Sequence, residues 1–254
     1  MNNSKVVVII QARMGSTRLP GKVLKKILDK PMLQYVVDQV SYANLVDELV
    51  VATTINPKDD EIVEFCKNSG VKCFRGSENN VLARYYYAAK EFKANCVVRI
   101  CSDSPLVDPF VIDKIVEIFL KNKGRYDYVS NTLDQTYPLG MNVEVFSQLS
   151  LEKSFLNSCK DYEKEHVTPY MYTNPKFFNI YKEQLSEKLN HLRLTVDESQ
   201  DFSLVEFIIK KLYCNDKPIY IKDISELYKK NKDVFSINSN INQKKIDYSL
   251  TVKQ

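Results

Sequence analysis

The sequence predicts an α/β fold with a Rossmann-like, mostly parallel sheet and flanking helices. Short β-branched runs alternate with amphipathic segments through the first 130 residues. This alternation is typical of βαβ units with right-handed crossovers. The length of 254 residues and the hydrophobic content of 44% suit one domain of ordinary globular composition.

The elements follow from local pattern in chain order. Apolar, largely β-branched runs predict strands at 5–10, 49–53, 71–74, 96–100 and 126–130. Helices are expected between them, beginning near Pro31, Asp59, Val81 and Pro109. The prolines at 31 and 109 suit the first turn of a helix. In the second half we expect strands at 140–146, 177–181 and 192–195, with helices at 161–172, 202–212 and 223–232.

This pattern predicts a single domain over residues 1–237. A small α+β elaboration is expected at about 134–190, where clean βαβ repeats stop. The polar, Lys-rich stretch 238–254 is expected to be a loosely held tail.

Composition excludes several classes of protein. The net charge of +4, from 36 basic and 32 acidic residues, is too small for a protein that coats nucleic acid. The apolar run 6–10 is too short for a signal-peptide core or a membrane span, so we expect a cytoplasmic protein with no membrane partner. Six cysteines without C-x-x-C spacing and two histidines predict neither a zinc ribbon nor a three-His zinc site.

The loop after the first predicted strand has the chemistry of a polyphosphate site. Ligands of open α/β sheets bind beyond the carboxyl ends of the strands, where this loop lies. Its glycines let backbone amides approach an anion, while cations and hydroxyls supply charge and hydrogen bonds. The spacing fits neither a Walker A loop nor a dinucleotide fingerprint. The loop residues expected to bind a nucleotide are Gln11, Ala12, Arg13, Gly15, Ser16, Thr17, Arg18 and Lys22.

Two aspartates follow later predicted strands. Asp103 lies after 96–100 in a turn closed by Pro105, and Asp197 follows 192–195. Carboxylates there suit a hard divalent cation that also contacts phosphate oxygens. The alternative for Asp103 is an ordinary Asx turn, and Asp201 is more simply a helix cap.

Together these segments resemble the nucleotide-diphosphosugar transferase fold. More closely, they resemble the cytidylyltransferases that activate acidic sugars, with the spore coat polysaccharide biosynthesis type as the nearest branch. The opening family motif A-R-x-x-S-x-R-L-P-x-K matches residues 12–22 without gaps. The motif D-x-P-L matches 103–106, and V-D-x-x-x-D matches 196–201.

The resemblance implies a role for each matching residue. Arg13, Ser16, Arg18 and Lys22 would hold the phosphates of CTP, and Arg13 and Lys22 would stabilise the leaving pyrophosphate. Asp103 and Asp197 would bind Mg²⁺, so Arg13, Lys22 and Asp103 are the expected catalytic residues. The remaining expected contacts are Thr53 and Arg84 for the nucleotide, and Asn142, Glu144 and His166 for the acceptor. A surface helix arginine is the alternative for Arg84. The family expectation is a homodimer.

The resulting hypothesis is a Mg²⁺-dependent cytidylyltransferase. It would transfer CMP from CTP to an acidic sugar or related acceptor and release pyrophosphate, for surface glycan biosynthesis. Asn142 stands where the family leads us to expect an aspartate, which leaves the acceptor open. Alternatives are a nucleotidyltransferase using another nucleotide or a phosphorylated acceptor, a non-catalytic nucleotide-binding protein, and a nucleotide-sugar glycosyltransferase. The glycosyltransferase would need a carboxylate pair such as Asp59-Asp60, which we expect to begin a surface helix.

Overall fold

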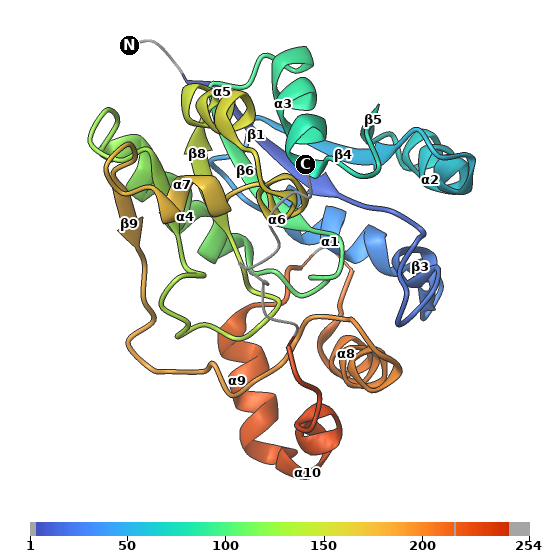
Figure 1. The fold of residues 1–254 in the computed structure, drawn as a ribbon. Helices are drawn as coiled ribbons and strands as arrows, with labels where there is room; N and C mark the ends of the chain where they lie inside the picture. Colours follow the sequence, from blue (N-terminus) through green and yellow to red (C-terminus); the bar gives the residue numbers. More distant parts are fainter. Residues whose placement is uncertain (1–3, 216, 244–254) are drawn as a thin grey trace.

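The computed structural model describes residues 4–215 and 217–243. Within this part of the chain, seven strands form one sheet in the order β5-β4-β1-β6-β8-β7-β9 (Figure 1). The neighbouring pairs are parallel except at β8, which runs antiparallel to both β6 and β7. The strands are β1 (Val6–Gln11), β4 (Glu48–Thr54), β5 (Lys72–Gly76), β6 (Cys96–Cys101), β7 (Tyr128–Ser130), β8 (Glu144–Ser147) and β9 (Ile180–Lys182). The predicted α/β class with a mostly parallel sheet is confirmed.

Helices cover both faces of the sheet. The helices of the described residues are α1 (Met32–Ser41), α2 (Asp60–Ser69), α3 (Val81–Glu91), α4 (Pro109–Lys121), α5 (Gln148–Asn157), α6 (Asp161–His166), α7 (Pro169–Thr173), α8 (Ser199–Leu212), α9 (Ile221–Lys230) and α10 (Lys232–Phe235). Of these, α8, α9 and α10 lie below the sheet in the view of Figure 1. A small hairpin of β2 (Lys26–Ile27) and β3 (Lys30–Pro31), which the periodicity did not predict, precedes α1. No helix among the described residues is both long enough and apolar enough to cross a membrane.

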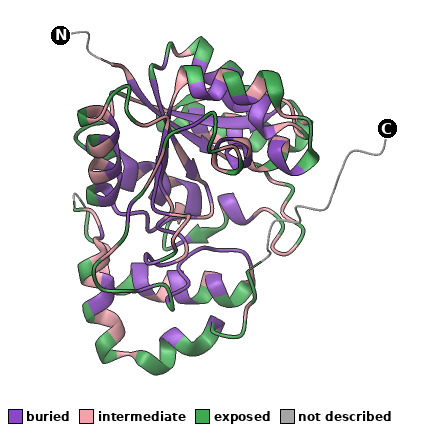
Figure 2. Ribbon diagram, turned by 60° about the vertical axis from the view of Figure 1, so that its left-hand side comes forward, coloured by how far each residue is buried: buried purple, intermediate pink, exposed green. Residues whose placement is uncertain are grey.

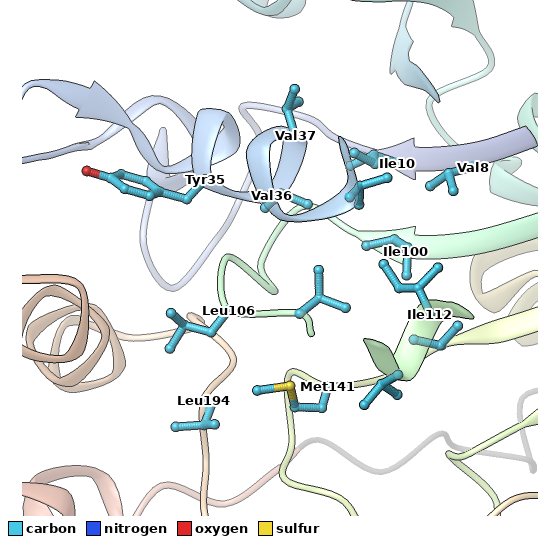
Figure 3. Packing of buried hydrophobic residues seen from close by; sticks show 14 of the residues in the cluster. Val8, Ile10, Tyr35, Val36, Val37, Ile100, Leu106, Ile112, Met141 and Leu194 are labelled. Carbon is cyan, nitrogen blue, oxygen red and sulfur yellow. The ribbon is translucent and has the colours of Figure 1, made fainter. Parts of the chain in front are cut away.

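The two faces of the sheet belong to two hydrophobic clusters. Successive strand residues point to opposite faces, so Val8 and Ile10 of β1 join one cluster while Val7 and Ile9 join the other. Figure 3 shows the first cluster, in which side chains of β1 and β6 pack with those of α1 and α4. The second cluster contains side chains of α3, α5 and α7. The central strands β1 and β6 are largely buried, the edge strands β5 and β9 are partly exposed, and the outer helix faces are exposed (Figure 2).

The ends of two helices are set by side-chain caps. Asp108 accepts a hydrogen bond from the Phe110 amide at 2.7 Å, with Pro109 in the first turn of α4. The other oxygen of Asp108 accepts from the Ile221 amide at 2.7 Å, which fixes the start of α9 beside α4. Asn80 caps α3 by accepting from the Ala83 amide.

The helix predicted over 161–172 is wrong as a single element, because the chain turns sharply at Val167. This β-branched residue has φ +73° and ψ −55°, and the Thr168 amide donates to the His166 carbonyl at 2.9 Å. These values describe a γ-turn, a strained conformation for a residue other than glycine. Pro169 then opens α7, since a proline cannot supply an amide to a continuing helix.

The predicted strand at 192–195 is also wrong, because the segment pairs with a single residue. The Leu194 amide donates to the Leu139 carbonyl at 2.7 Å, and the Leu139 amide donates to Leu192 at 3.0 Å. The strand expected at 140–146 begins only at Glu144.

The expected loose tail does not begin at 238. Asn238 is only 2% exposed and donates to the Arg193 carbonyl at 2.9 Å and to Asp201 at 2.8 Å. The chain is therefore anchored at the start of this stretch. The part of the predicted tail at 244–254 lies outside the described residues.

Gly140 offers a test of the close packing between its own segment and residues 194–195. Its φ is +95°, and a Cβ placed there would lie 2.5 Å from the Thr195 nitrogen and 2.6 Å from the Leu194 carbonyl carbon. We expect Gly140→Ala to lower the free energy of unfolding by about 3 kcal/mol, measured by urea titration. Gly124→Ala is the matched control, since Gly124 has φ +82° but no neighbour within 4 Å. The control should lose only about 1–2 kcal/mol, and equal losses in both variants would contradict the steric argument.

Candidate active site

A cleft opens at the carboxyl ends of β1 and β6, with a volume of about 860 Å³. Its walls come from the loop after β1, the turn after β6, the start of α3 and the segments near Asn142, His166 and Asp197. The predicted site residues that line it are Gln11, Ala12, Arg13, Ser16, Thr17, Arg18, Lys22, Arg84, Asp103, Asn142, Glu144, His166 and Asp197. In the described part of the chain, Gly15 and Thr53 are not among the lining residues, and Thr53 is fully buried in β4.

The loop after β1 is shaped by its own backbone. The Met14 carbonyl accepts from the Ser16 amide at 2.8 Å and from the Gly21 amide at 3.2 Å. Gly21 adopts φ +67°, a left-handed conformation that glycine takes without steric cost. The Ser16 hydroxyl accepts from the Leu19 amide, so this side chain also stabilises the loop. The compact turn directs Arg13, Arg18 and Lys22 to one cleft.

Asp59 supports this loop, a role that sequence reasoning missed. The prediction of a surface position at the start of a helix is wrong for Asp59, which is 2% exposed. Its carboxylate accepts from the Met14 amide at 2.7 Å and from the Thr54 hydroxyl. Its neighbour Asp60 is the exposed residue of the pair and forms an ion pair with Arg75. The signal that could have found Asp59 is its place just after β4, at the edge of the sheet where the loop lies.

Opposite charges meet across the cleft at Lys22. Its ammonium lies 3.3 Å from Asp103 Oδ2 and 3.0 Å from Asp197 Oδ1, and it also donates to the Val196 carbonyl. Arg18 Nη2 lies 3.0 Å from Asp197 Oδ2. The structure therefore brings two of the predicted phosphate-binding cations, Arg18 and Lys22, into contact with the predicted metal-binding carboxylates.

The electrostatic surroundings keep Asp197 ionised. Burial alone would raise the pKa of its carboxyl, but Lys22, Arg18 and Arg193 outweigh burial and hold that pKa below its usual value. Asp201 caps α8, as predicted, by accepting from the amides of Asp197 and Glu198 at 3.0 Å. Arg193, which sequence reasoning did not select, contacts both aspartates.

The donor set at Asp103 and Asp197 fits Mg²⁺. Magnesium is commonly bound by one or two carboxylates together with substrate phosphates rather than by a complete protein cage. The described residues contain no group of three or more His, Cys, Asp or Glu side chains that could hold a metal alone. The carboxylates of Asp103 and Asp197 both contact the Lys22 ammonium and face the cation-rich loop. They therefore match a site in which two carboxylates bind the metal together with substrate phosphates.

Arg84 is a buried residue, so the surface alternative is wrong. It is 3% exposed, its Nη1 donates to the Ser77 carbonyl at 3.0 Å, and burial lowers the pKa of its guanidinium. Its Nε has no hydrogen-bond partner among the described residues. A buried guanidinium with a spare donor on the cleft wall is suited to a polar ligand group.

The opposite end of the cleft contains a buried ion pair between β6 and β8. Arg99 donates to Glu144, which also accepts from the hydroxyls of Tyr128 and Thr168 at 2.6 Å. Burial opposes the charge of Arg99, but Glu144 more than compensates and raises the pKa of the guanidinium. Glu144 is only 4% exposed and already well hydrogen-bonded. Arg99 lines the cleft as well, although sequence reasoning did not assign it a role.

His166 and Asn142 complete this end of the cleft. Burial lowers the pKa of the His166 imidazole, against the opposing charge of Glu165, and so favours the neutral ring. The γ-turn at Val167 sets His166 and Thr168 side by side on the cleft wall. The Oδ1 atom of Asn142 is buried and has no hydrogen-bond partner within the described residues. These groups offer polar contacts to a ligand that lies beyond the cation loop.

Comparisons with known proteins agree with this geometry. The cytidylyltransferase family model matches residues 7–246. The spore coat polysaccharide biosynthesis protein SpsF of Bacillus subtilis is 32% identical over 213 residues, which cover 81% of this chain and 87% of that protein.

Solved structures show the same fold. A cytidylyltransferase from Leptospira borgpetersenii has a TM-score of 0.87 and 33% identity, covering 95% of this chain and 100% of that chain. The CMP:2-keto-3-deoxy-manno-octonic acid synthetase complexed with CTP has a TM-score of 0.64 and 18% identity, covering 83% and 100%. This second likeness shows the fold alone. From the family match and the relatives together, the chain belongs to the cytidylyltransferase family of nucleotidyltransferases.

Proposed function

We propose that this enzyme transfers CMP from CTP to an acidic sugar with release of pyrophosphate, in the synthesis of a surface glycan, and that it uses Mg²⁺. The observation that carries the proposal is the contact of Lys22 with both Asp103 and Asp197 at the mouth of the cation loop. Cations that would bind phosphate and carboxylates suited to a metal would thereby lie within reach of one polyphosphate.

The residues would act by positioning and by neutralising charge. Arg13, Arg18 and Lys22 would bind the phosphates, and they would stabilise the charge that develops on the departing pyrophosphate. The acceptor oxygen would attack the α-phosphorus in line, the bond to the β-phosphate would break, and the acceptor proton would pass to solvent. Mg²⁺ held by Asp103 and Asp197 would neutralise charge on the phosphate oxygens. This chemistry requires no covalent nucleophile.

The acceptor would occupy the end of the cleft near Arg99 and His166. Its polar groups could use the Nε donor of Arg99 and the Oδ1 acceptor of Asn142, which have no hydrogen-bond partner among the described residues. The name of the relative SpsF, a spore coat polysaccharide biosynthesis protein, supports a product destined for a surface glycan.

The glycosyltransferase alternative lacks its carboxylate pair. Asp59 is buried and holds the loop through Met14, while Asp60 forms an ion pair with Arg75. Neither is among the described residues that line the cleft. The products separate the two reactions, because a nucleotidyltransferase releases pyrophosphate and a glycosyltransferase releases a nucleoside diphosphate.

The metal carboxylates provide the first test of this function. We would incubate the protein with Mg²⁺, one of CTP, UTP, GTP or ATP, and a panel of sugar acids and sugar phosphates. We expect pyrophosphate and a CMP-linked product from CTP. Asp103→Asn and Asp197→Asn should each reduce the rate by about 100-fold or more, because charge stabilisation at the phosphates is lost.

The control for this test is Asp233→Asn, which changes an exposed carboxylate on α10 and should leave the rate unchanged. Full activity in both cleft variants would contradict the metal assignment. Release of a nucleoside diphosphate would contradict the reaction class.

The loop support provides a second test. Asp59→Ala leaves the part-buried Met14 amide without its acceptor, which costs about 1–3 kcal/mol in the conformation expected to bind phosphate. We expect CTP to bind roughly 10-fold more weakly, measured by calorimetry. The neighbouring variant Asp60→Ala removes only an exposed ion pair and should bind CTP like the unaltered protein. Equal CTP affinity in Asp59→Ala would show that Asp59 does not organise the loop.

A further inference from the structure

Arg193 lies behind the cleft rather than in it. It is 7% exposed and, among the described residues, is not one of those that line the cleft. Its Nη2 donates to Asp197 Oδ2 at 2.9 Å and to Asp201 Oδ2 at 3.1 Å, and its Nε donates to Asp201 Oδ1 at 2.9 Å. One planar guanidinium thus bridges the carboxylate that faces the cleft and the carboxylate that caps α8.

The anchor of this guanidinium is rigid. Asp201 is fully buried, accepts from the Asp197 and Glu198 amides, and also accepts from Asn238 at 2.8 Å. The Asn238 side chain donates to the Arg193 carbonyl as well. Arg193 is therefore fixed by α8 on one side and by the segment that follows α10 on the other.

The two carboxylate oxygens of Asp197 contact different cations. Oδ1 contacts Lys22, whereas Oδ2 contacts Arg18 and Arg193. Lys22 and Arg18 line the cleft and belong to the loop proposed to bind phosphate. If a nucleotide drew Lys22 and Arg18 away from Asp197, the contact between Asp197 and Arg193 would remain. Arg193 is not among the described residues that line the cleft, so the nucleotide would not reach it.

We propose that Arg193 is a positioning residue that holds Asp197 by Oδ2, so that Oδ1 stays oriented toward a divalent cation while Lys22 and Arg18 move to the nucleotide. This inference rests on the proposed function and assigns a role to a residue outside the cleft. Arginine suits the role because its planar fork spans two carboxylates at once, whereas lysine is a single point charge. Residues that orient metal ligands in this way typically change metal affinity by about 10- to 100-fold when altered.

Binding measurements on the full chain test this role without relying on turnover. Calorimetry would measure the affinity for α,β-methylene-CTP in EDTA, and then the affinity of that complex for Mg²⁺. The main variant is Arg193→Lys, which keeps the charge but cannot bridge both aspartates. We expect nucleotide affinity within about twofold of the unaltered protein and Mg²⁺ affinity lower by about 10- to 100-fold.

A second variant keeps the test decisive if Arg193→Lys does not fold. Asp201→Asn weakens the anchor of Arg193 while leaving Asp197 intact, and it should lower Mg²⁺ affinity in the same direction but less. The matched control is Arg125→Lys, which alters an exposed arginine whose guanidinium lies over the Tyr126 ring and should change neither affinity. Circular dichroism would verify that each variant is folded.

Three results would overturn the inference. The first is unchanged Mg²⁺ affinity in folded Arg193→Lys. The second is an equal loss of nucleotide and Mg²⁺ affinity, which indicates a general structural role. The third is the absence of Mg²⁺ binding to the nucleotide complex of the unaltered protein. Failure of the proposed function is a different result. In that case the unaltered protein would not bind the CTP analogue, or would bind it yet release no pyrophosphate with any acceptor.

Discussion

The contact of the Lys22 ammonium with Asp103 and Asp197 joins three parts of the chain that are far apart in sequence. Buried charges are costly unless they are paired, and here the Lys22 ammonium is paired with both carboxylates. Much of the surrounding structure keeps this contact in place. Asp59 holds the loop that leads to Lys22, and Arg193 holds Asp197. The same charges that neutralise one another here are the ones a nucleotide and a divalent cation would need.

The sheet explains why these segments meet. The parallel strands β1 and β6 end at the same edge, so the cation loop and the Asp103 turn are neighbours. The Val196 amide donates to the Asp103 carbonyl at 2.9 Å, which places Asp197 beside that turn. The far end of the cleft depends on strain instead, since the γ-turn at Val167 brings Thr168 onto Glu144. Non-glycine residues in such conformations persist only where the surroundings hold them, and they concentrate at functional sites.

Local pattern predicted the main strands and helices of the first half well, because the buried strands there, such as β1, are mostly apolar. It also predicted the cation loop and both aspartates of the Lys22 contact. It could not predict that β8 lies antiparallel between β6 and β7, since pairing partners are not encoded locally. Arg193 and Asp59 were missed for a related reason: their roles come from partners distant in sequence. The break near Val167 had a local signal, because Pro169 stands inside the predicted helix and has no amide to donate to it.

A crystal structure of this chain with CTP and Mg²⁺ tests the central claim most directly. The account predicts that Lys22 leaves Asp103 and Asp197 to contact phosphate oxygens, that Arg13 and Arg18 contact the same polyphosphate, and that the metal lies on the two carboxylates. A polyphosphate bound elsewhere, with Lys22 still between Asp103 and Asp197, would contradict it.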